Sequence, residues 1–210
     1  MAGVFLVIEG GDGAGKSRLQ KSLADRLRNH GHDVLETREP GGTTLGEQIR
    51  ALVLARSSLE DPLAELLLFE AARAHLVSTV IRPALQANRV VICDRFAPSS
   101  VAYQAFGRGL PRDLVDRANA LATQGLAPAL TILIDVAVER GRARRAEAGI
   151  ADHFDTETAE FHERVRNGYV QMARELPNRW RIIDGAMAFD RVLHAATEAV
   201  RPLLPKPAEK

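Results

Sequence analysis

What this chain lacks narrows its class before any motif is considered. Its 210 residues include one cysteine, no run of 18 apolar residues and a net charge of only +1. A chain without a disulfide framework is typical of a reducing compartment, which indicates a cytosolic address. Without a long apolar run, no membrane-spanning helix is predicted. The balanced charge gives no indication of nucleic acid or an anionic membrane as the main partner.

Other features are missing as well. The N-terminus leads directly into an apolar strand, without the basic region and cleavable apolar segment of an export signal. No internal repeat is visible, and no segment has low complexity before residues 202–210, a tail that we expect to fray. The single thiol, Cys93, lies within an apolar run and is expected to be buried rather than reactive. We predict one domain over residues 1–210.

Strand-like and helix-like segments alternate along the chain. This alternation predicts an α/β fold in which right-handed crossovers join parallel strands, and helices cover both faces of one five-stranded sheet. Strands are predicted near residues 4–9, 33–37, 89–93, 130–134 and 180–183. Helices are predicted near residues 16–29, 44–56, 62–87, 112–123, 137–147, 157–176 and 187–201. Ligands of such sheets bind beyond the carboxyl ends of the strands, so polar residues there are candidate site residues.

The most informative segment is a phosphate-binding loop between the first strand and the first helix. Its residues fit the pattern G-x-x-x-x-G-K-[ST] in full: Gly10, Gly11, Asp12, Gly13, Ala14, Gly15, Lys16 and Ser17. A glycine turn at a helix N-terminus aims backbone N–H groups at an anion. The lysine reaches the β- and γ-phosphates, and the hydroxyl ligates Mg²⁺. The loop therefore indicates a nucleoside triphosphate, with Lys16 as a catalytic charge and Ser17 as a metal ligand.

The third strand ends in an acidic and a basic residue. A carboxylate at a strand tip beside a phosphate loop, here Asp94, suits Mg²⁺ and its waters. The adjacent Arg95 suits a second substrate that already carries a phosphate. By position alone the two residues also fit a surface ion pair.

Two further groups of residues have both a functional and a structural interpretation. Residues 96–104 mix hydroxyls, an amide and an aromatic ring, which suits a base edge and a sugar face, but also a helix N-cap with a packed tyrosine. Phe69 and Arg73 are four residues apart on a predicted helix, so they share a face. A ring and a guanidinium together suit stacking on a base and donation to its carbonyl. The alternative is a core ring with a surface arginine.

Positive charge gathers in residues 139–145, which include four arginines: Arg140, Arg142, Arg144 and Arg145. Such a run on a helix is usually a solvated face. Its place after the fourth strand and before a glycine-containing loop also fits a lid, at about residues 141–156, that closes over phosphates. The segments 38–44 and 147–156 are predicted to stay out of the core and to be candidates for substrate contact.

Together these segments resemble the bacterial thymidylate kinases, P-loop enzymes that move a phosphoryl group from ATP to dTMP. The resemblance covers roughly residues 4–200. It rests on Glu9–Ser17, Thr37–Thr43, Asp94–Phe96, Ser99–Gln104 and Gly107–Gly109. The phosphate loop occurs in many families, whereas Arg-Glu-Pro-Gly-Gly-Thr followed by Asp-Arg at this separation is specific. The resemblance implies a P-loop NTPase fold, ATP and Mg²⁺, a step in dTTP synthesis, and a homodimer formed through helices beside the sheet.

The resemblance also implies roles for single residues. Asp12 would accept a hydrogen bond from the 3′-hydroxyl of dTMP, and Tyr103 would crowd a ribose 2′-hydroxyl. Phe69 would stack on thymine, and Arg73 would donate to its O4. The other residues expected around dTMP, its phosphate and its metal are Arg38, Glu39, Arg50, Arg95, Ser99, Ser100 and Gln104. The bond from Glu39 to Pro40 is expected to be cis.

Two positions depart from the pattern of the family. Position 13 is glycine rather than arginine. Family members of this kind carry their catalytic arginine in the lid, where Arg144 aligns best, and Arg142 and Arg145 are expected to act on ATP. The lid ends in Asp152-His153 rather than Asp-Arg, so one expected arginine is missing and Arg142 or Arg145 is expected to compensate. The sequence leaves open which arginine acts in the transition state.

Two other functions compete with this interpretation. Another nucleoside monophosphate kinase, or a deoxynucleoside kinase, would share the fold. Phe69 with Arg73 favours a pyrimidine that carries an O4 acceptor, because cytosine would present a donor there and leave the arginine unpaired. Arg50 and Arg95 favour a substrate with a phosphate. A P-loop switch or partitioning ATPase would need a water-positioning residue after the third strand, where this chain has Arg95.

Overall fold

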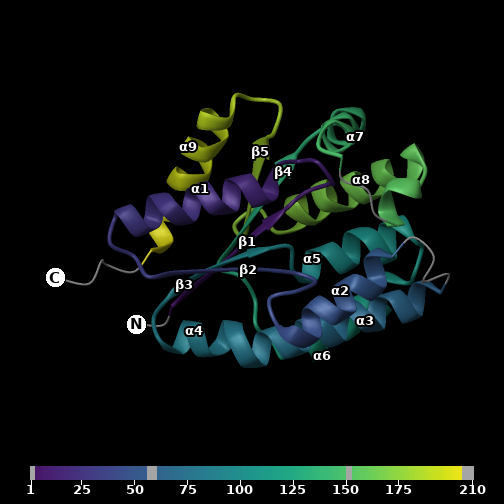
Figure 1. Cartoon of the computed structure of the whole chain (residues 1–210), viewed down its shortest axis with the longest axis horizontal. Helices are drawn as coiled ribbons and strands as arrows, with labels where there is room; N and C mark the ends of the chain where they lie inside the picture. Colours follow the sequence, from purple (N-terminus) through teal and green to yellow (C-terminus); the bar gives the residue numbers. More distant parts are fainter. Residues whose placement is uncertain (1–2, 56–60, 150–152, 205–210) are drawn as a thin grey trace.

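Five parallel strands form one central sheet in the computed structural model, which describes residues 3–55, 61–149 and 153–204 (Figure 1). The strands are β1 (Val4–Glu9), β2 (Val34–Arg38), β3 (Val90–Asp94), β4 (Leu130–Asp135) and β5 (Trp180–Asp184). Their order across the sheet is β2-β3-β1-β4-β5, and every neighbouring pair is parallel. The predicted fold class is confirmed, and each strand lies within one residue of its predicted bounds.

The helices pack on both faces of the sheet. Those of the first half are α1 (Lys16–Asn29), α2 (Thr44–Leu54), α3 (Pro62–Leu76), α4 (Arg82–Gln86) and α5 (Ala97–Ser100). Those of the second half are α6 (Arg112–Thr123), α7 (Val138–Glu147), α8 (Ala159–Glu175) and α9 (Phe189–Val200). Two π-helical stretches, η1 (Val77–Ile81) and η2 (Val101–Gly107), continue α3 and α5, and two short 3₁₀ turns are η3 (His153–Thr156) and η4 (Arg201–Leu203).

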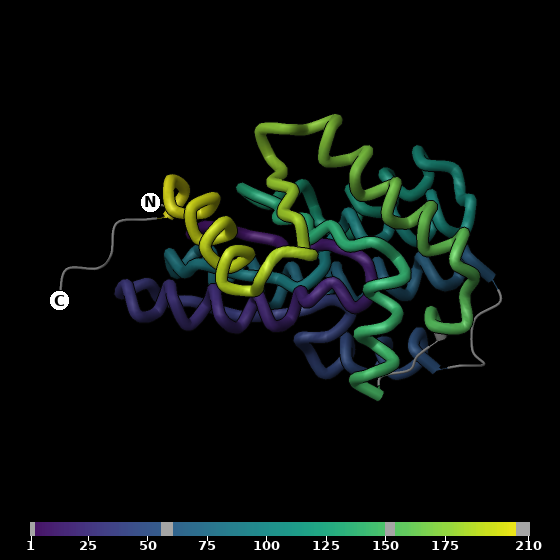
Figure 2. The backbone as a smooth tube through the Cα atoms, turned by 90° about the horizontal axis from the view of Figure 1, so that it is seen from above, coloured from purple at the N-terminus to yellow at the C-terminus, as the bar shows by residue number. Residues whose placement is uncertain are grey.

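Alternating side chains of the strands build a separate core on each face. Leu6 and Ile8 of β1 pack with α1 and α9, which lie side by side along one face (Figure 2). Phe5 and Val7 point the other way and pack with α3, η1 and α4. Because both faces are covered, β1 and β3 are buried along their whole length, which explains their continuous apolar sequences. Cys93 is buried in the second core, as predicted.

The structure corrects the prediction for the segments 97–107 and 38–44. No helix was predicted over residues 97–107, yet α5 and η2 are helical there. Pro98 is tolerated because it occupies the first turn, where a missing N–H costs nothing. The segment 38–44 was predicted to stay out of the core, but Glu39, Pro40 and Gly41 are buried. A backbone hydrogen bond from Glu39 to the Asp94 carbonyl, 2.9 Å long, draws this segment inward, and the Glu39–Pro40 bond is cis, as expected.

The lid and the tail are described in part. The predicted lid over 141–156 includes most of α7 and the turn η3. Residues 147–156 were predicted to stay out of the core, but Phe154 of η3 is buried in a hydrophobic cluster with Tyr103 and Phe161. Asp152 and the side chain of His153 lie outside the described part of the chain, so nothing is concluded about that pair. The tail was predicted to fray from residue 202, but Pro202 and Leu203 belong to η4. Among the described residues, no helix has the length and apolar character needed to cross a membrane.

Candidate active site

A cavity of about 820 Å³ opens at the carboxyl ends of the central strands, where the sheet rule places a ligand. It brings together most of the predicted site residues: Asp12, Gly13, Ala14, Gly15, Lys16, Ser17, Arg38, Glu39, Arg50, Phe69, Arg73, Asp94, Arg95, Ser99, Ser100, Tyr103, Gln104, Arg144 and Arg145. Gly10 and Gly11 lie in the same loop without lining the cavity. Arg142 is exposed and does not line it either, so here the solvated-face interpretation fits.

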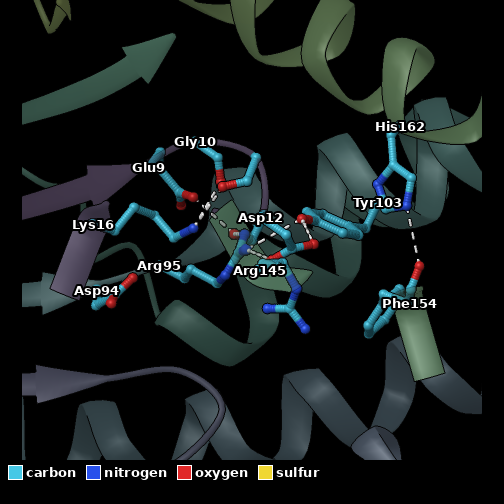
Figure 3. A network of polar contacts seen from close by, with 12 residues as sticks. Glu9, Gly10, Asp12, Lys16, Asp94, Arg95, Tyr103, Arg145, Phe154 and His162 are labelled. Atoms are coloured by element: carbon cyan, nitrogen blue, oxygen red, sulfur yellow. Dashed lines mark hydrogen bonds and ion pairs between the residues drawn. The ribbon is translucent and has the colours of Figure 1, made fainter. Parts of the chain in front are cut away.

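The phosphate loop wraps around the side chain of its own lysine. Three of its glycines, Gly10, Gly13 and Gly15, have positive φ, which residues with a side chain rarely adopt. The Lys16 ammonium donates to the carbonyls of Gly10 and Gly11, at 3.0 and 2.9 Å (Figure 3). Burial, and then the nearby charge of Arg95, lower the pKa of Lys16 to about 8. The lysine is therefore a buried charge held at the mouth of an anion site.

Two oxygen donors converge beside this lysine. Ser17 lies in the first turn of α1 and Asp94 ends β3, and the Ser17 hydroxyl donates to the Asp94 carboxylate at 2.6 Å. Hydroxyl and carboxylate oxygens are the ligands that Mg²⁺ takes in nucleotide sites, together with phosphate oxygens and water. The donor set therefore fits that ion.

Arg95 donates hydrogen bonds to several side chains around the cavity (Figure 3). Its Nη2 donates to Asp12 at 2.5 Å and to the Tyr103 hydroxyl at 3.2 Å. The same hydroxyl donates to the other Asp12 oxygen at 2.7 Å. Burial alone would raise the pKa of Asp12, but the charges of Arg95 and Lys16 outweigh it and hold that pKa well below its usual range. The carboxylate is thus ionised and available as an acceptor.

Behind Arg95 lie two residues that sequence reasoning did not assign to the site. Glu9 is fully buried and accepts from the Phe96 N–H at 2.9 Å and the Tyr169 hydroxyl at 2.9 Å. That hydroxyl also accepts from Arg95 Nη1 at 3.1 Å. Burial raises the pKa of Glu9 despite the charge of Arg95. Tyr169 gave no signal in the sequence, because it occupies an ordinary core position of the amphipathic helix α8.

Arg73 lies on the floor of the cavity at 1% exposure, which excludes the surface-arginine interpretation. Its Nε donates to Glu39 at 2.7 Å, and its Nη1 donates to Glu70 at 2.5 Å and to Asn119 at 2.7 Å. Burial raises the pKa of Glu39 to about 8, against the opposing charge of the arginine. One cation is therefore shared by two buried carboxylates, in a cavity that the partly buried ring of Phe69 also lines.

The two arginines of α7 that line the cavity, Arg144 and Arg145, bind different partners. Arg144 donates to the carbonyls of Gly13, at 3.5 Å, and Gly185, at 3.1 Å, and so reaches the phosphate loop. Arg145 forms a two-bond ion pair with Asp155, at 2.7 and 2.6 Å. On the opposite wall, the Arg38 side chain pairs with Glu47, while Arg50, also part of that wall, donates to a backbone carbonyl.

The cavity extends beyond the predicted residues. Its further lining residues are Arg18, Pro40, Leu54, Ile134, Ala148, Phe154, Gly185, Met187, Phe189 and Val192. Several of these form an apolar lobe on the α9 side, where the Arg18 guanidinium lies 3.8 Å from the centre of the Phe189 ring. The segment after β5 could have been found from the sequence, because it follows a strand at the ligand-binding edge.

Comparison with known proteins agrees with this geometry. A family model described as thymidylate kinase matches residues 8–195. The chain belongs to the thymidylate kinase family. It is 43% identical over 205 residues to the thymidylate kinase of Geotalea uraniireducens, covering 94% of this chain and 96% of the relative. It is 45% identical over 209 residues to the thymidylate kinase of Desulfovibrio desulfuricans, covering 96% of each.

A solved thymidylate kinase has the same fold. The crystal structure of the enzyme from Ehrlichia chaffeensis superposes with a TM-score of 0.78 at 32% identity. The match covers 96% of this chain and 99% of the other. Likeness to thymidylate kinases therefore extends over nearly the whole chain.

Proposed function

We propose that this protein transfers the γ-phosphoryl group of ATP to dTMP. The bond from the γ-phosphorus to the β,γ-bridging oxygen breaks, and an oxygen of the dTMP phosphate bonds to that phosphorus, giving ADP and dTDP. The observation that carries the proposal is that a phosphate loop and a second cationic group, centred on Arg95, open into the same cavity. That arrangement suits two phosphorylated substrates held end to end.

The donor half is built from the loop and from α1. Backbone N–H groups of the loop and the Lys16 ammonium bind the β- and γ-phosphates. Ser17 and Asp94 would hold Mg²⁺, which neutralises charge on the phosphate oxygens when bound. Arg144 is the proposed transition-state donor, because it already reaches the loop carbonyl of Gly13.

The acceptor half is built from β2, α3 and the segment after β3. Arg38, Arg50 and Arg95 surround the acceptor phosphate, and Asp12 accepts from the sugar 3′-hydroxyl. The base lies on Phe69, with the hydroxyl of Ser100 and the amide of Gln104 at its edge. Within the described part of the chain, Phe96 O is the acceptor recorded for Arg73 Nη2, at 3.2 Å. That nitrogen has two hydrogens, so one remains for a base carbonyl such as O4.

The competing functions fit these contacts less well. A cytosine amino group would face the donor of Arg73 and leave it unpaired, at a cost of about 1–3 kcal/mol. A switch ATPase would need a residue that positions water after Asp94. In this chain Arg95 occupies that place and is bound to Asp12 at 2.5 Å.

A panel of acceptors tests the proposal. ADP formation is measured with dTMP, dUMP, dCMP, dGMP and TMP in its ribose form, each with ATP and Mg²⁺, and without acceptor. We expect the highest kcat/KM with dTMP and slow ADP formation without acceptor. A purine or cytosine acceptor used as well as dTMP would contradict the assignment of Phe69 and Arg73.

We also propose that the enzyme works in the cytoplasm as a homodimer. The dimer follows from the family resemblance, and four leucines of α2 and α3 support it, because 41–56% of their surface is exposed: Leu45, Leu52, Leu63 and Leu67. Light scattering after size exclusion tests it, and a mass of one chain at micromolar concentration would contradict it.

A further inference from the structure

The lid helix and the phosphate loop meet backbone to backbone. A Cβ built on Gly13 would lie 2.1 Å from the carbonyl oxygen of Gly141, in α7. A Cβ built on Gly141 would lie 2.4 Å from the carbonyl oxygen of Asp12. Both contacts are with backbone, which cannot rotate away as the end of a side chain can. Two glycines facing each other therefore allow this approach, and a larger residue on either side would separate the two segments.

Glycine at position 141 is not explained by the helix itself. Its N–H donates to the Ala137 carbonyl at 3.1 Å, as in a regular helix, and its φ is not positive. In that conformation alanine favours the helix more than glycine does. The benefit of glycine must therefore come from the close approach to the loop.

That approach fixes the position of the next turn of α7. Arg144 follows Gly141 by three residues, about one helical turn, so it lies on the same side of the helix. Its guanidinium reaches Gly13 O at 3.5 Å and Gly185 O at 3.1 Å. The docking of α7 on the phosphate loop thus accounts both for the close approach of Gly141 to Asp12 and for the position of the Arg144 guanidinium at the loop.

We propose that Gly141 is a positioning residue, whose missing side chain lets α7 dock on the phosphate loop and holds Arg144 at the phosphates. At position 13 two features exclude a side chain, the positive φ and the approach of the Gly141 carbonyl. The role of Arg144 in catalysis rests on the proposed function, whereas the docking of α7 does not.

Gly141→Ala tests the role directly. The new Cβ would lie 2.4 Å from the Asp12 carbonyl oxygen, and an ordinary contact is 3.4 Å. The helix α7 must therefore move away from the loop by about 1 Å. A displacement of that size can lower a rate by about 10²-fold. We expect kcat to fall about 10–100-fold and Tm to stay unchanged. The Kd for dTMP should change far less than kcat, because the new methyl group meets only the backbone carbonyl of Asp12 and not its carboxylate. Ala143→Gly, at an exposed position of the same helix, is the control for altered helix propensity and should keep kcat.

A double-mutant cycle shows whether Gly141 acts through Arg144. In an Arg144→Ala background, adding Gly141→Ala should lower kcat by less than twofold, because the group that it displaces is already gone. Losses that multiply, or a Gly141→Ala variant with wild-type kcat, would overturn the proposal. If Gly141→Ala lowers Tm, the rate of proteolytic cleavage in α7 relative to cleavage elsewhere in the chain decides the docking role instead.

Limited proteolysis separates this proposal from the proposed function. Trypsin cleaves after arginine, and α7 contains Arg140, Arg142, Arg144 and Arg145. We expect cleavage in α7 to be several-fold faster in Gly141→Ala than in the wild type or in Ala143→Gly, because a helix off the loop opens more often. Equal cleavage rates would overturn the docking role. A wild-type protein without dTMP-dependent turnover would instead contradict the proposed function, and the cleavage comparison would still decide the docking.

Discussion

At the scale of single residues, Arg73 is a buried cation shared by two carboxylates. It is 1% exposed and pairs with two buried carboxylates, those of Glu39 and Glu70. We expect Arg73→Ala to lower the free energy of unfolding by about 3–5 kcal/mol, because both carboxylates lose their cation. Its loss should also weaken dTMP binding more than ATP binding.

Urea unfolding measures the loss of stability in Arg73→Ala, and its dependence on pH provides a second test. Because buried carboxyls take up protons more readily than unfolded ones, the variant should lose stability as pH rises above about 4.5, the ordinary carboxyl pKa. Arg112→Ala is the control, since its ion pairs with Asp116 and Glu175 are exposed and worth about 1 kcal/mol or less. A loss at Arg73 no larger than this would contradict the shared-cation interpretation.

Lys16 gives a prediction for the effect of pH on nucleotide binding. Its pKa of about 8 in the free enzyme means that the ammonium loses its proton as pH rises through that value. A neutral lysine attracts phosphate less, so ATP affinity should fall above pH 8, by up to about tenfold per pH unit. Calorimetric titration with an unreactive ATP analogue from pH 7 to 9.5 measures the affinity. Above pH 8 it should also detect a proton taken up on binding, because the bound phosphates favour the charged lysine. Lys16→Met should bind weakly and without this pH dependence, whereas constant wild-type affinity would refute the assignment.

At the scale of elements, α7 presents different faces to the loop and to solvent. Arg142 and Arg144 point about 200° apart on a helix, and only Arg144 of these two lines the cavity. We expect Arg144→Ala to lower kcat by about 10²–10³-fold with little change in dTMP affinity. Arg142→Ala should stay close to wild type, and Arg145→Ala should mainly weaken ATP binding. Equal losses of kcat at Arg142 and Arg144 would show that the helix docks differently in turnover.

Some elements could be predicted from the sequence and others could not, for physical reasons. The strands and α1 follow from apolar runs and leucine spacing, which reflect burial on the sheet. The helical segment 97–107 was missed, because Pro98 and paired serines resemble a turn while tertiary packing decides the outcome. Burial of Glu39 could not be predicted either, since its partner Arg73 is distant in sequence.

At the scale of the whole molecule, the family resemblance located most of the cavity wall, because motifs at fixed separations reach one edge of the sheet. Contacts that depend on the approach of two backbones were not predictable. The approach of Gly13 to Gly141 joins segments that are far apart in the chain, and nothing in either segment alone indicates it. The apolar lobe near Phe189 was missed as well, although its position after β5, at the ligand-binding edge, could have indicated it.

Ligand binding should stabilise the molecule as a whole. A ligand at about 100 times its Kd adds about 2.7 kcal/mol, which for a chain of this size raises Tm by about 5–10 °C. We expect dTMP and an unreactive ATP analogue each to produce such a shift in scanning calorimetry, and their shifts to add approximately. AMP at the same concentration as dTMP should produce a much smaller one. A shift with AMP as large as that with dTMP would contradict the base assignment.

The central claim is that the γ-phosphoryl group goes to an acceptor phosphate and not to water. It is tested most directly by following the γ-phosphate of labelled ATP in the wild type and in Lys16→Ala, with and without dTMP. The account predicts that with dTMP the label appears in dTDP, with little inorganic phosphate, and that Lys16→Ala slows transfer by about 10²-fold or more. Label released as inorganic phosphate at the same rate with and without dTMP would contradict it.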